Sequence, residues 1–258
     1  MPLEFKHKPG LVVYVTCGDP DLQTTAAVAV AAAEAGADVI ELGVPFSDPV
    51  ADGPVIQRAS ERALRRGTTL EQMLDTACQV RQQTGAGLIV FSYLNPILKF
   101  GLERFCAAAE AARIDGALIT DLPVEEAGEY IRSMRAHRLA AVFLAAPTSP
   151  DERLKRIAEA SSGFVYAVSR TGVTGARAEL PEDARILVER IRRFTALPVA
   201  VGFGISTPEQ FAAVGEYAEA AVVGSAIVRT IEDSSGSPVQ AVAELVRRLR
   251  APVTVGDS

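Results

Sequence analysis

The sequence predicts an α/β fold, a (β/α)8 TIM barrel formed by a single domain over residues 1–258. Short β-branched runs alternate with Ala-, Leu- and Arg-rich stretches, and eight such pairs follow one another along the chain. A length of 258 residues suits one such barrel, and no linker or shift in composition divides it. A doubly wound open sheet is the alternative, but its Gly-rich first turn does not follow Leu11–Thr16. We therefore favour the barrel.

The strands are expected where β-branched and aliphatic residues form short runs bounded by turn residues. In order they are Leu11–Thr16, Val39–Val44, Leu88–Tyr93, Ala117–Asp121, Ala141–Ala145, Phe164–Ser169, Val199–Gly202 and Ala220–Val223.

Helices are expected between these strands, and several have a recognisable start. Thr207 and Ser149 each place a capping hydroxyl before a proline at the first helical position. The expected helices are Thr24–Ala35, Val55–Arg66, Leu70–Thr84, Glu103–Arg113, Val124–His137, Pro150–Ala160, Glu182–Phe194, Pro208–Glu216 and Pro238–Arg250.

Composition narrows the class of protein. The chain is 48% hydrophobic, and its net charge of −6 without a Lys/Arg run argues against nucleic-acid binding. Cys17, Cys78 and Cys106 are scattered without a CxxC pair, which favours core thiols over a metal site. No apolar run reaches membrane-spanning length and the polar start is no signal peptide, so we expect a cytoplasmic protein.

Glu41 stands in the middle of the second predicted strand. Strand alternation places it on the same face as Val39 and Gly43. Ile40 and Leu42 face the other way, so the strand has no polar side. A buried carboxylate is costly unless it is paired, neutralised or used. Burial would raise its pKa, which suits a group that moves protons near neutrality, whereas the alternative is a structural ion pair inside the barrel.

Two further carboxylates lie on the long loop Pro45–Pro54 that follows this strand. Loops at the C-terminal ends of barrel strands carry the active site, so Asp48 and Asp52 are candidates. Each also fits a turn (Ser-Asp-Pro and Ala-Asp-Gly), and turn capping is the alternative role. The loop Arg170–Pro181 after the sixth strand is also long, and both loops are candidate lids.

Inward-facing aromatic residues are expected at Tyr14, Tyr93 and Tyr166, where they could line an apolar slot for a flat substrate or simply pack the core. Neither His7 nor His137 lies near a predicted strand end, so a histidine base is disfavoured. No lysine lies at a barrel-strand end either, which disfavours Schiff-base aldolase chemistry.

Glycines after the last two strands indicate a phosphate site. Barrels of this kind bind phosphate with the loops after strands seven and eight and the N-terminus of a short extra helix. Gly204 and Gly224-Ser225 lie in these loops, Ala226–Asp233 could be the helix, and Gly175 could complete the site. The alternative is that these glycines serve only the turns.

Seven motifs resemble those of the tryptophan synthase alpha chain family. The 14 residues Glu41-Leu-Gly-Val-Pro-Phe-Ser-Asp-Pro-Val-Ala-Asp-Gly-Pro match its signature. The others, in order, are Gly18-Asp-Pro, Tyr93-Leu-Asn-Pro, Asp121-Leu-Pro-Val-Glu-Glu, Ser169-Arg-Thr-Gly-Val-Thr-Gly, Gly202-Phe-Gly-Ile-Ser and Gly224-Ser-Ala-Ile-Val. The resemblance extends from about Leu11 to Arg250.

This resemblance implies reversible retro-aldol cleavage of indole-3-glycerol phosphate to indole and glyceraldehyde 3-phosphate. Glu41 would be the general acid/base, and Asp52 would interact with the indole N–H and stabilise the indolenine tautomer. Tyr166 would position Glu41 and the substrate, and Thr174 would hydrogen-bond Asp52 when the lid containing Arg170 closes. The remaining implied contacts are Tyr14, Phe91, Tyr93 and Leu118 with the indole, and Gly175, Gly204, Gly224 and Ser225 with the phosphate.

The resemblance also implies a partner. The family works as an α2β2 complex in which indole passes through a tunnel to a beta chain that carries pyridoxal phosphate. Asp48, Pro49, Asn95 and Pro123 lie in segments that would touch this partner. The alpha chain itself would need no metal or cofactor.

One departure concerns the barrel floor. The family usually begins with an amphipathic helix that closes it, whereas only about ten residues precede Leu11 here. Either other residues cover the floor or the start codon is misassigned. Two other functions stay open besides the complex: a stand-alone lyase that releases free indole, and a non-catalytic activator of a beta chain, which the presence of both Glu41 and Asp52 disfavours. A phosphate-binding isomerase barrel is a further alternative.

Overall fold

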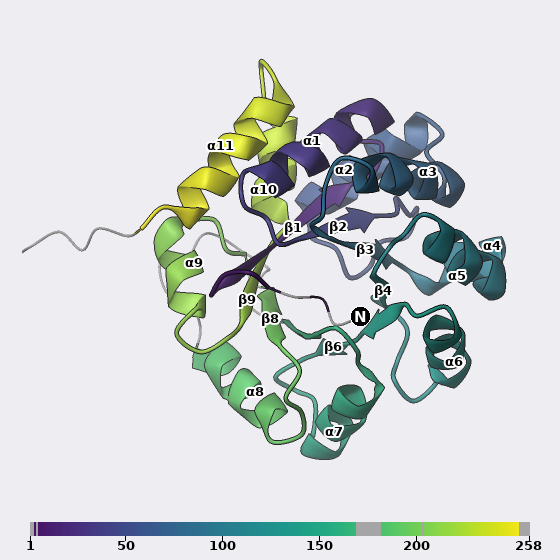
Figure 1. Ribbon diagram of the computed structural model, residues 1–258, viewed down its shortest axis with the longest axis vertical. Helices are drawn as coiled ribbons and strands as arrows, with labels where there is room; N and C mark the ends of the chain where they lie inside the picture. The colour runs from purple at the N-terminus through teal and green to yellow at the C-terminus, as the bar shows by residue number, and fades with distance from the viewer. Residues whose placement is uncertain (1–2, 4, 169–181, 203, 253–258) are drawn as a thin grey trace, which may run out of the picture.

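A computed structural model of the chain describes residues 3, 5–168, 182–202 and 204–252. Within these residues a parallel sheet of nine strands is surrounded by helices (Figure 1). The strands are β1 (Gly10–Thr16), β2 (Val39–Gly43), β3 (Gly87–Ser92), β4 (Gly116–Ile119), β5 (Ala140–Val142), β6 (Leu144–Ala145), β7 (Val165–Val168), β8 (Val199–Gly202) and β9 (Ala220–Val223).

The two ends of this sheet meet at one residue. The strand order is β5-β4-β3-β2-β1-β9-β8-β7-β6, and along the chain only Phe143 separates β5 from β6. β5 pairs with β4, whereas β6 pairs with β7, and the carbonyl of Phe143 accepts the amide N–H of Tyr166 at 3.1 Å. The predicted strand Ala141–Ala145 is therefore one bent strand that closes the barrel, and the predicted (β/α)8 architecture is confirmed.

Each predicted helix is present, with small differences at its ends. The helices are α1 (Leu22–Glu34), α2 (Pro54–Arg65), α3 (Leu70–Arg81), α4 (Leu94–Phe100), α5 (Leu102–Ala111), α6 (Gly128–Ala136), α7 (Asp151–Ala160), α8 (Glu182–Arg192), α9 (Pro208–Val214), α10 (Ser225–Glu232) and α11 (Pro238–Arg250). None of these described helices is long and apolar enough to cross a membrane.

Two helices differ from the sequence prediction. α4 was not among the expected helices. Its Pro96 falls in the first turn of the helix, where an N–H has no intrahelical acceptor, so the proline is compatible with it. α6 begins at Gly128 rather than at Val124. The preceding residues form tight turns instead, in which the amide N–H of Glu126 donates to the carbonyl of Pro123 at 3.0 Å.

Alternate strand residues fill two separate layers. Val39 and Leu118 pack inside the barrel, whereas Ile40 and Leu42 pack between the strands and the helices. Glu41 lies between Ile40 and Leu42 and therefore faces the interior, as the alternation predicts.

Leu3 and Phe5 fill the barrel floor, at the N-terminal ends of the strands. A Cβ placed on Gly87 or on Gly163 would lie 2.7 Å or 3.1 Å from the side chain of Leu3. The ring of Phe5 packs against that of Phe164 with 5.9 Å between centroids. Leu3 and Phe5 therefore cover the floor at the place where the family resemblance implies a helix.

Candidate active site

Glu41 occupies the interior of the barrel near the C-terminal end of β2. Its exposed fraction is 0%, and neither carboxylate oxygen has a hydrogen-bond partner among the residues that the structure describes. Burial raises the pKa of Glu41 to about 8. Of the two roles considered for this residue, the structural ion pair is absent from the described part of the barrel, and the carboxyl group is left available to exchange a proton.

Asp52 lies on the loop between β2 and α2 and is half-buried. Burial raises its pKa to about 6, and a hydrogen bond with Tyr93 opposes this rise. The side-chain amide of Gln57, in the first turn of α2, donates to the carbonyl of Asp52 at 2.8 Å. The Tyr93 hydroxyl accepts the N–H of Ala51 at 2.9 Å. These contacts hold the Asp52 loop between α2 and the end of β3.

Tyr14 and Tyr166 enclose the space beside the two carboxyl groups. Tyr14 lies opposite Glu41 in the β1–β2 register. Burial, followed by the charges of Glu41 and Asp52, raises the pKa of Tyr166 well above its usual value. Its hydroxyl would be 2.3 Å from a Cβ on Gly202 of β8, so only glycine leaves room for the ring there. Glu41, Asp52 and the two tyrosines thus form one cluster at the barrel mouth.

Apolar side chains adjoin this cluster. The rings of Tyr14 and Phe91 meet edge to face, with centroids 5.1 Å apart and planes at 76°. Leu118 is fully buried and pairs with Phe91 in the β3–β4 register. Tyr93 is placed differently, because its ring packs against Phe46 at 5.0 Å and its hydroxyl faces the Asp52 loop.

Three of the four predicted phosphate residues, Gly204, Gly224 and Ser225, lie at the same end of the barrel. Gly224 is the N-cap of α10 and Ser225 is the first residue of this helix, so its first N–H groups lack intrahelical acceptors. A Cβ on Gly224 would be 3.6 Å from the Cβ of Tyr14, which places this helix end beside the Tyr14 ring. Gly204, after β8, is exposed and has a φ of +59°, which favours glycine.

Three predicted site residues, Arg170, Thr174 and Gly175, lie outside the described residues. Their predicted roles as lid and phosphate contacts stay predictions.

The predicted partner-contact residues lie on loops and helix starts around the barrel mouth. Asp48 and Asn95 are exposed, and Pro49 and Pro123 are half-buried. Near them are two exposed apolar side chains that the sequence analysis did not single out. Val50 is 86% exposed and Leu98, on α4, is 59% exposed. Leu98 lies on α4. Because this helix was not expected from the sequence, the exposure of Leu98 could not be predicted either.

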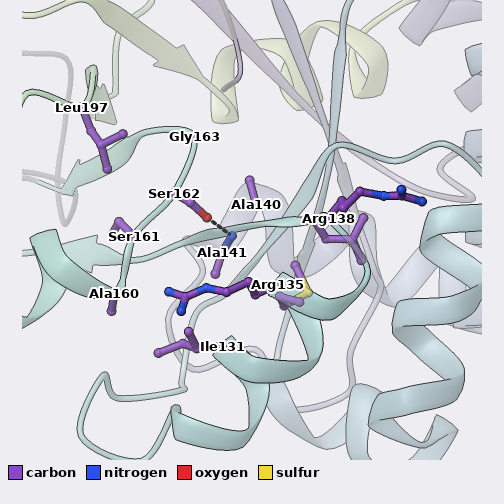
Figure 2. A pocket seen from close by; sticks show the side chains of 12 residues that line it. Ile131, Arg135, Arg138, Ala140, Ala141, Ala160, Ser161, Ser162, Gly163 and Leu197 are labelled. Carbon is purple, nitrogen blue, oxygen red and sulfur yellow. Dashed lines mark hydrogen bonds between the residues drawn. The ribbon is translucent and has the colours of Figure 1, made fainter. Parts of the chain in front are cut away.

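Two cavities lie away from the Glu41 cluster. One, of about 430 Å³, is lined by Arg135, Leu139 and Gly163 among others, at the N-terminal ends of β5, β7 and β8 (Figure 2). The other, of about 280 Å³, lies beside Asp121 and Arg153. In the part of the chain that the structure describes, no group of three or more His, Cys, Asp or Glu side chains could hold a metal ion.

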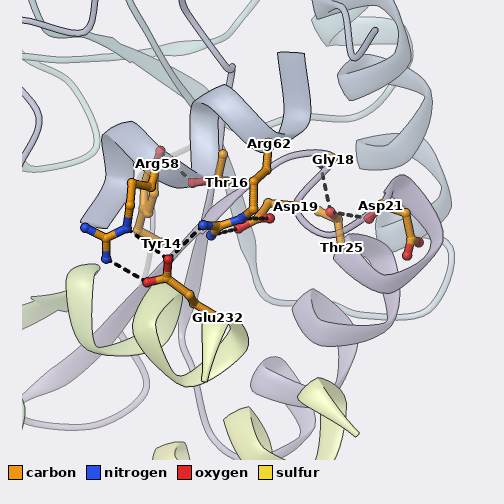
Figure 3. Close-up of polar contacts among 9 residues, drawn as sticks. All are labelled: Tyr14, Thr16, Gly18, Asp19, Asp21, Thr25, Arg58, Arg62 and Glu232. Atoms are coloured by element: carbon orange, nitrogen blue, oxygen red, sulfur yellow. Dashed lines mark hydrogen bonds and ion pairs between the residues drawn. The ribbon is translucent and has the colours of Figure 1, made fainter. Parts of the chain in front are cut away.

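An ion-pair network that was not predicted from the sequence lies behind the site. Arg62 of α2 pairs with Asp19 and with Glu232, and Arg58 pairs with Glu232 as well (Figure 3). The spacing of four residues between the two arginines places them on one face of the helix. That spacing was the available signal, but it does not tell which acidic residues lie opposite.

The chain is similar over most of its length to known proteins. The family model described as tryptophan synthase alpha chain matches residues 2–253. A protein of that name from Solibacter usitatus is 52% identical over 235 residues, which are 91% of this chain and 88% of that protein. The one from Geotalea daltonii is 49% identical over 247 residues, with 95% and 94% of the two chains covered.

Solved structures show the same likeness. A tryptophan synthase structure from Mycobacterium tuberculosis superposes with a TM-score of 0.88 at 38% identity, covering 94% of this chain and 91% of that one. A tryptophan synthase complex from Pyrococcus furiosus gives a TM-score of 0.87 at 38% identity, covering 94% and 98%.

Proposed function

This chain belongs to the tryptophan synthase alpha chain family, and from that premise we propose that Glu41 and Asp52 carry out its lyase reaction. The reaction is the retro-aldol cleavage of indole-3-glycerol phosphate to indole and glyceraldehyde 3-phosphate in L-tryptophan biosynthesis. The observation that carries the residue assignment is the buried Glu41 carboxyl group, which has no partner among the described residues and lies in one cluster with Asp52.

The two carboxyl groups have pKa values that suit different roles. Between about pH 6 and pH 8, Glu41 is protonated and Asp52 is ionised. A protonated Glu41 can therefore act as a general acid while the Asp52 carboxylate stabilises positive charge. The two pKa values differ because the environments differ: Glu41 is fully buried, whereas Asp52 is half-buried beside the Tyr93 hydroxyl.

The chemistry follows from these protonation states. Glu41 donates its proton to indole C3, which becomes sp³, and the charge that develops on the ring nitrogen is stabilised by the Asp52 carboxylate. The Glu41 carboxylate then takes the proton of the C3′ hydroxyl. The C3–C3′ bond breaks, its electron pair returns to the indole ring, and the C3′ oxygen becomes the aldehyde oxygen. Glu41 ends protonated, so the proton lost by the hydroxyl balances the one gained at C3.

The surrounding residues would hold the substrate in this position. The indole ring would pack against Tyr14, Phe91 and Leu118, and Tyr166 would position Glu41. The phosphate would be bound at the start of α10 by Gly224 and Ser225 together with Gly204, because the helix N-terminus offers unpaired N–H groups. Gly175, Thr174 and Arg170 would complete the phosphate site and the lid.

The experiment for this assignment is indole release by the purified protein, with and without a beta chain. We expect Glu41→Gln and Asp52→Asn to lose at least 99% of the turnover of the unaltered chain. Wild-type turnover by Glu41→Gln in the presence of the beta chain would refute the acid/base role. Full activity of the unaltered chain alone would indicate a stand-alone lyase, and indole release by neither preparation would indicate a non-catalytic activator.

We also propose that the chain is cytoplasmic and joins a beta chain in an α2β2 complex, with pyridoxal phosphate held by the beta chain. Asp48, Pro49, Asn95 and Pro123 surround the barrel mouth from which indole would leave. Val50 and Leu98 add exposed apolar area to this surface, which is typical of a protein contact.

The interface proposal has a matched control within the chain. Leu98→Asp should weaken binding of the beta chain at least tenfold in calorimetry, because it places a charge in an apolar contact. Ile186 is a comparably exposed apolar residue on α8, and Ile186→Asp should leave the affinity within twofold. Equal effects of the two substitutions would show that this surface is not the interface.

A further inference from the structure

Arg62 connects three separate parts of the barrel wall. Its Nε and Nη2 atoms donate to the two carboxylate oxygens of Asp19 at 2.8 Å and 2.7 Å. Its Nη1 atom donates to Glu232 Oε1 at 2.8 Å. Asp19 belongs to the loop between β1 and α1, and Glu232 is the last residue of α10. Figure 3 shows the guanidinium between these two carboxylates.

Burial makes the Asp19 contact sensitive to geometry. Asp19 is only 3% exposed, and about a third of the Arg62 side chain is accessible, at 32%. The fork of two parallel N–H groups matches a carboxylate in one orientation only. Glu232 accepts hydrogen bonds from both arginines. These bonds, first from Arg58 and then from Arg62, lower the pKa of Glu232 to about 2.

The two helices that Arg62 joins carry different halves of the proposed site. α2 begins two residues after Asp52, whose carbonyl is held by Gln57 at 2.8 Å. α10 begins at Ser225, the proposed phosphate end. Arg62 and Glu232 lie roughly 10–12 Å further along their helices, at a rise of about 1.5 Å per residue. The network therefore joins the two helices behind the site, and within the described residues no hydrogen bond or ion pair connects Arg62 to Glu41, Asp52 or Ser225.

The contact between α2 and α10 nearer the site is apolar. Val55 and Ala59 of α2 form a small cluster with Val228 of α10 and with Tyr14 of β1. Packing of this kind is not directional, and packed helices can slide by small distances. The hydrogen-bonded Arg62 contacts are directional, so they determine the relative position that the apolar contacts leave less well defined.

We propose that Arg62 is a positioning residue that sets the separation between Asp52 and the phosphate-binding end of α10. This inference rests on the proposed function, because a substrate with an indole at one end and a phosphate at the other must fit both ends together. A displacement of about 1 Å can cost on the order of 100-fold in rate. Arg62 would thus determine how well the distance between the two ends of the site matches the length of the substrate.

Arg58 provides the matched control. It is one turn earlier on the same helix and donates to the same Glu232, at 3.0 Å and 2.8 Å. It is half exposed and the structure gives it no contact with Asp19. Arg58→Gln therefore removes one arginine of the network while the Arg62 connection remains.

The test measures binding of ligands that occupy one or both ends of the site. We expect Arg62→Gln to weaken binding of an indole joined to a phosphate by a three-carbon chain at least tenfold. Binding of inorganic phosphate alone, and of indole alone, should stay within twofold of the unaltered chain. Arg58→Gln should leave all three affinities within twofold. Equal loss of phosphate and of the joined ligand would overturn the proposal, because it would indicate a damaged phosphate site.

Turnover gives a second readout. Arg62→Gln should lower kcat for cleavage at least tenfold in the complex with the beta chain, measured well below its melting temperature. Arg62→Lys keeps the charge but loses the two parallel N–H groups of the guanidinium. Its kcat should lie between those of Arg62→Gln and the unaltered chain, roughly 3–10-fold below the latter. It decides the question if Arg62→Gln does not fold.

The two hypotheses fail in different ways. Lowered thermal stability of Arg62→Lys with unchanged kcat and unchanged binding of the joined ligand would show a purely structural role and overturn this inference. Absence of indole release by the unaltered chain would instead overturn the proposed function.

Discussion

The hydroxyl oxygen of Tyr14 occupies space that a side chain on Gly43 would need. A Cβ placed on Gly43 would lie 2.2 Å from this oxygen, well inside van der Waals contact. Tyr14 is 4% exposed and its ring packs on Phe91, so it has little room to move. The glycine at the end of β2 therefore allows an aromatic ring to lie beside Glu41.

Gly43→Ala should accordingly displace Tyr14 and damage the site. Overpacking of a core typically costs about 1–3 kcal/mol, and we expect kcat for indole release to fall roughly 10–100-fold. The measurement is steady-state cleavage together with chemical denaturation. Gly85→Ala is the control, since nothing lies within 4 Å of its Cβ position. Near-normal turnover of Gly43→Ala would mean that Tyr14 is not needed where it lies.

Glu41 should make the stability of the fold depend on pH. Its pKa is about 8 in the folded chain against a usual value of 4.5, so the folded chain binds more protons than the unfolded chain between these values. The free energy of unfolding should therefore fall as pH rises through this window. Relative to Glu41→Gln, the unaltered chain should lose roughly 2–4 kcal/mol between pH 5 and pH 9.

Denaturant unfolding at several pH values measures this difference. The constant cost of burying an amide in Glu41→Gln cancels, because only the change with pH is compared. Glu126→Gln, at an exposed position in the loop before α6, is the control. Parallel pH curves for the unaltered chain and Glu41→Gln would show that the carboxyl group is not held protonated.

Activity should have a falling limb at alkaline pH. In the proposed cleavage Glu41 must start protonated, and its pKa is about 8, so kcat/KM should decline about tenfold per pH unit well above that value. The ionisation of Asp52, whose pKa is about 6, adds a rising limb, which overlaps the second ionisation of the substrate phosphate near pH 6. The alkaline limb is therefore the diagnostic one, and a rate that keeps rising beyond pH 9 would contradict the assignment.

Tyr93→Phe should change Asp52 rather than the indole pocket. The substitution removes the hydroxyl that accepts the Ala51 N–H and that lowers the pKa of Asp52. We expect the pKa of Asp52 to rise by about one unit and kcat to fall about 3–10-fold. Carbon-13 NMR of labelled aspartate side chains measures the pKa directly.

The control for Tyr93 is another buried tyrosine. The Tyr130 hydroxyl donates to the carbonyl of Ala117 at 3.0 Å, away from Asp52, so Tyr130→Phe should leave the titration unchanged. A raised KM of Tyr93→Phe with an unchanged pKa of Asp52 would instead favour a contact with the indole.

Local patterns were sufficient to predict most of the fold. β-branched runs and capping residues are short-range signals, so β8 and β9 were predicted with their observed limits and Glu41 on its observed face. The bend at Phe143 was not predictable, because it arises from the need to close the sheet, which involves β4 and β7 as well as the bent strand itself.

The site was predictable to the extent that it follows from strand ends. Glu41, Tyr14 and Ser225 are placed by the barrel architecture alone. Tyr93 shows where that reasoning stops, since it lies at the end of β3 but its hydroxyl is directed by the Asp52 loop. The Arg62 network depends on three segments up to 213 residues apart, from Asp19 to Glu232, and no local pattern indicates which of them meet.

The placement of Leu3 and Phe5 has a consequence for synthesis of the chain. These side chains emerge from the ribosome before Gly163 and Phe164, and their contacts with these two residues require about 160 further residues. At a translation rate of about 5–20 residues per second, the two side chains wait roughly 10–30 s for these neighbours. The barrel floor therefore joins an early segment of the nascent chain to one made about 160 residues later, so it cannot close before that later segment has been synthesised.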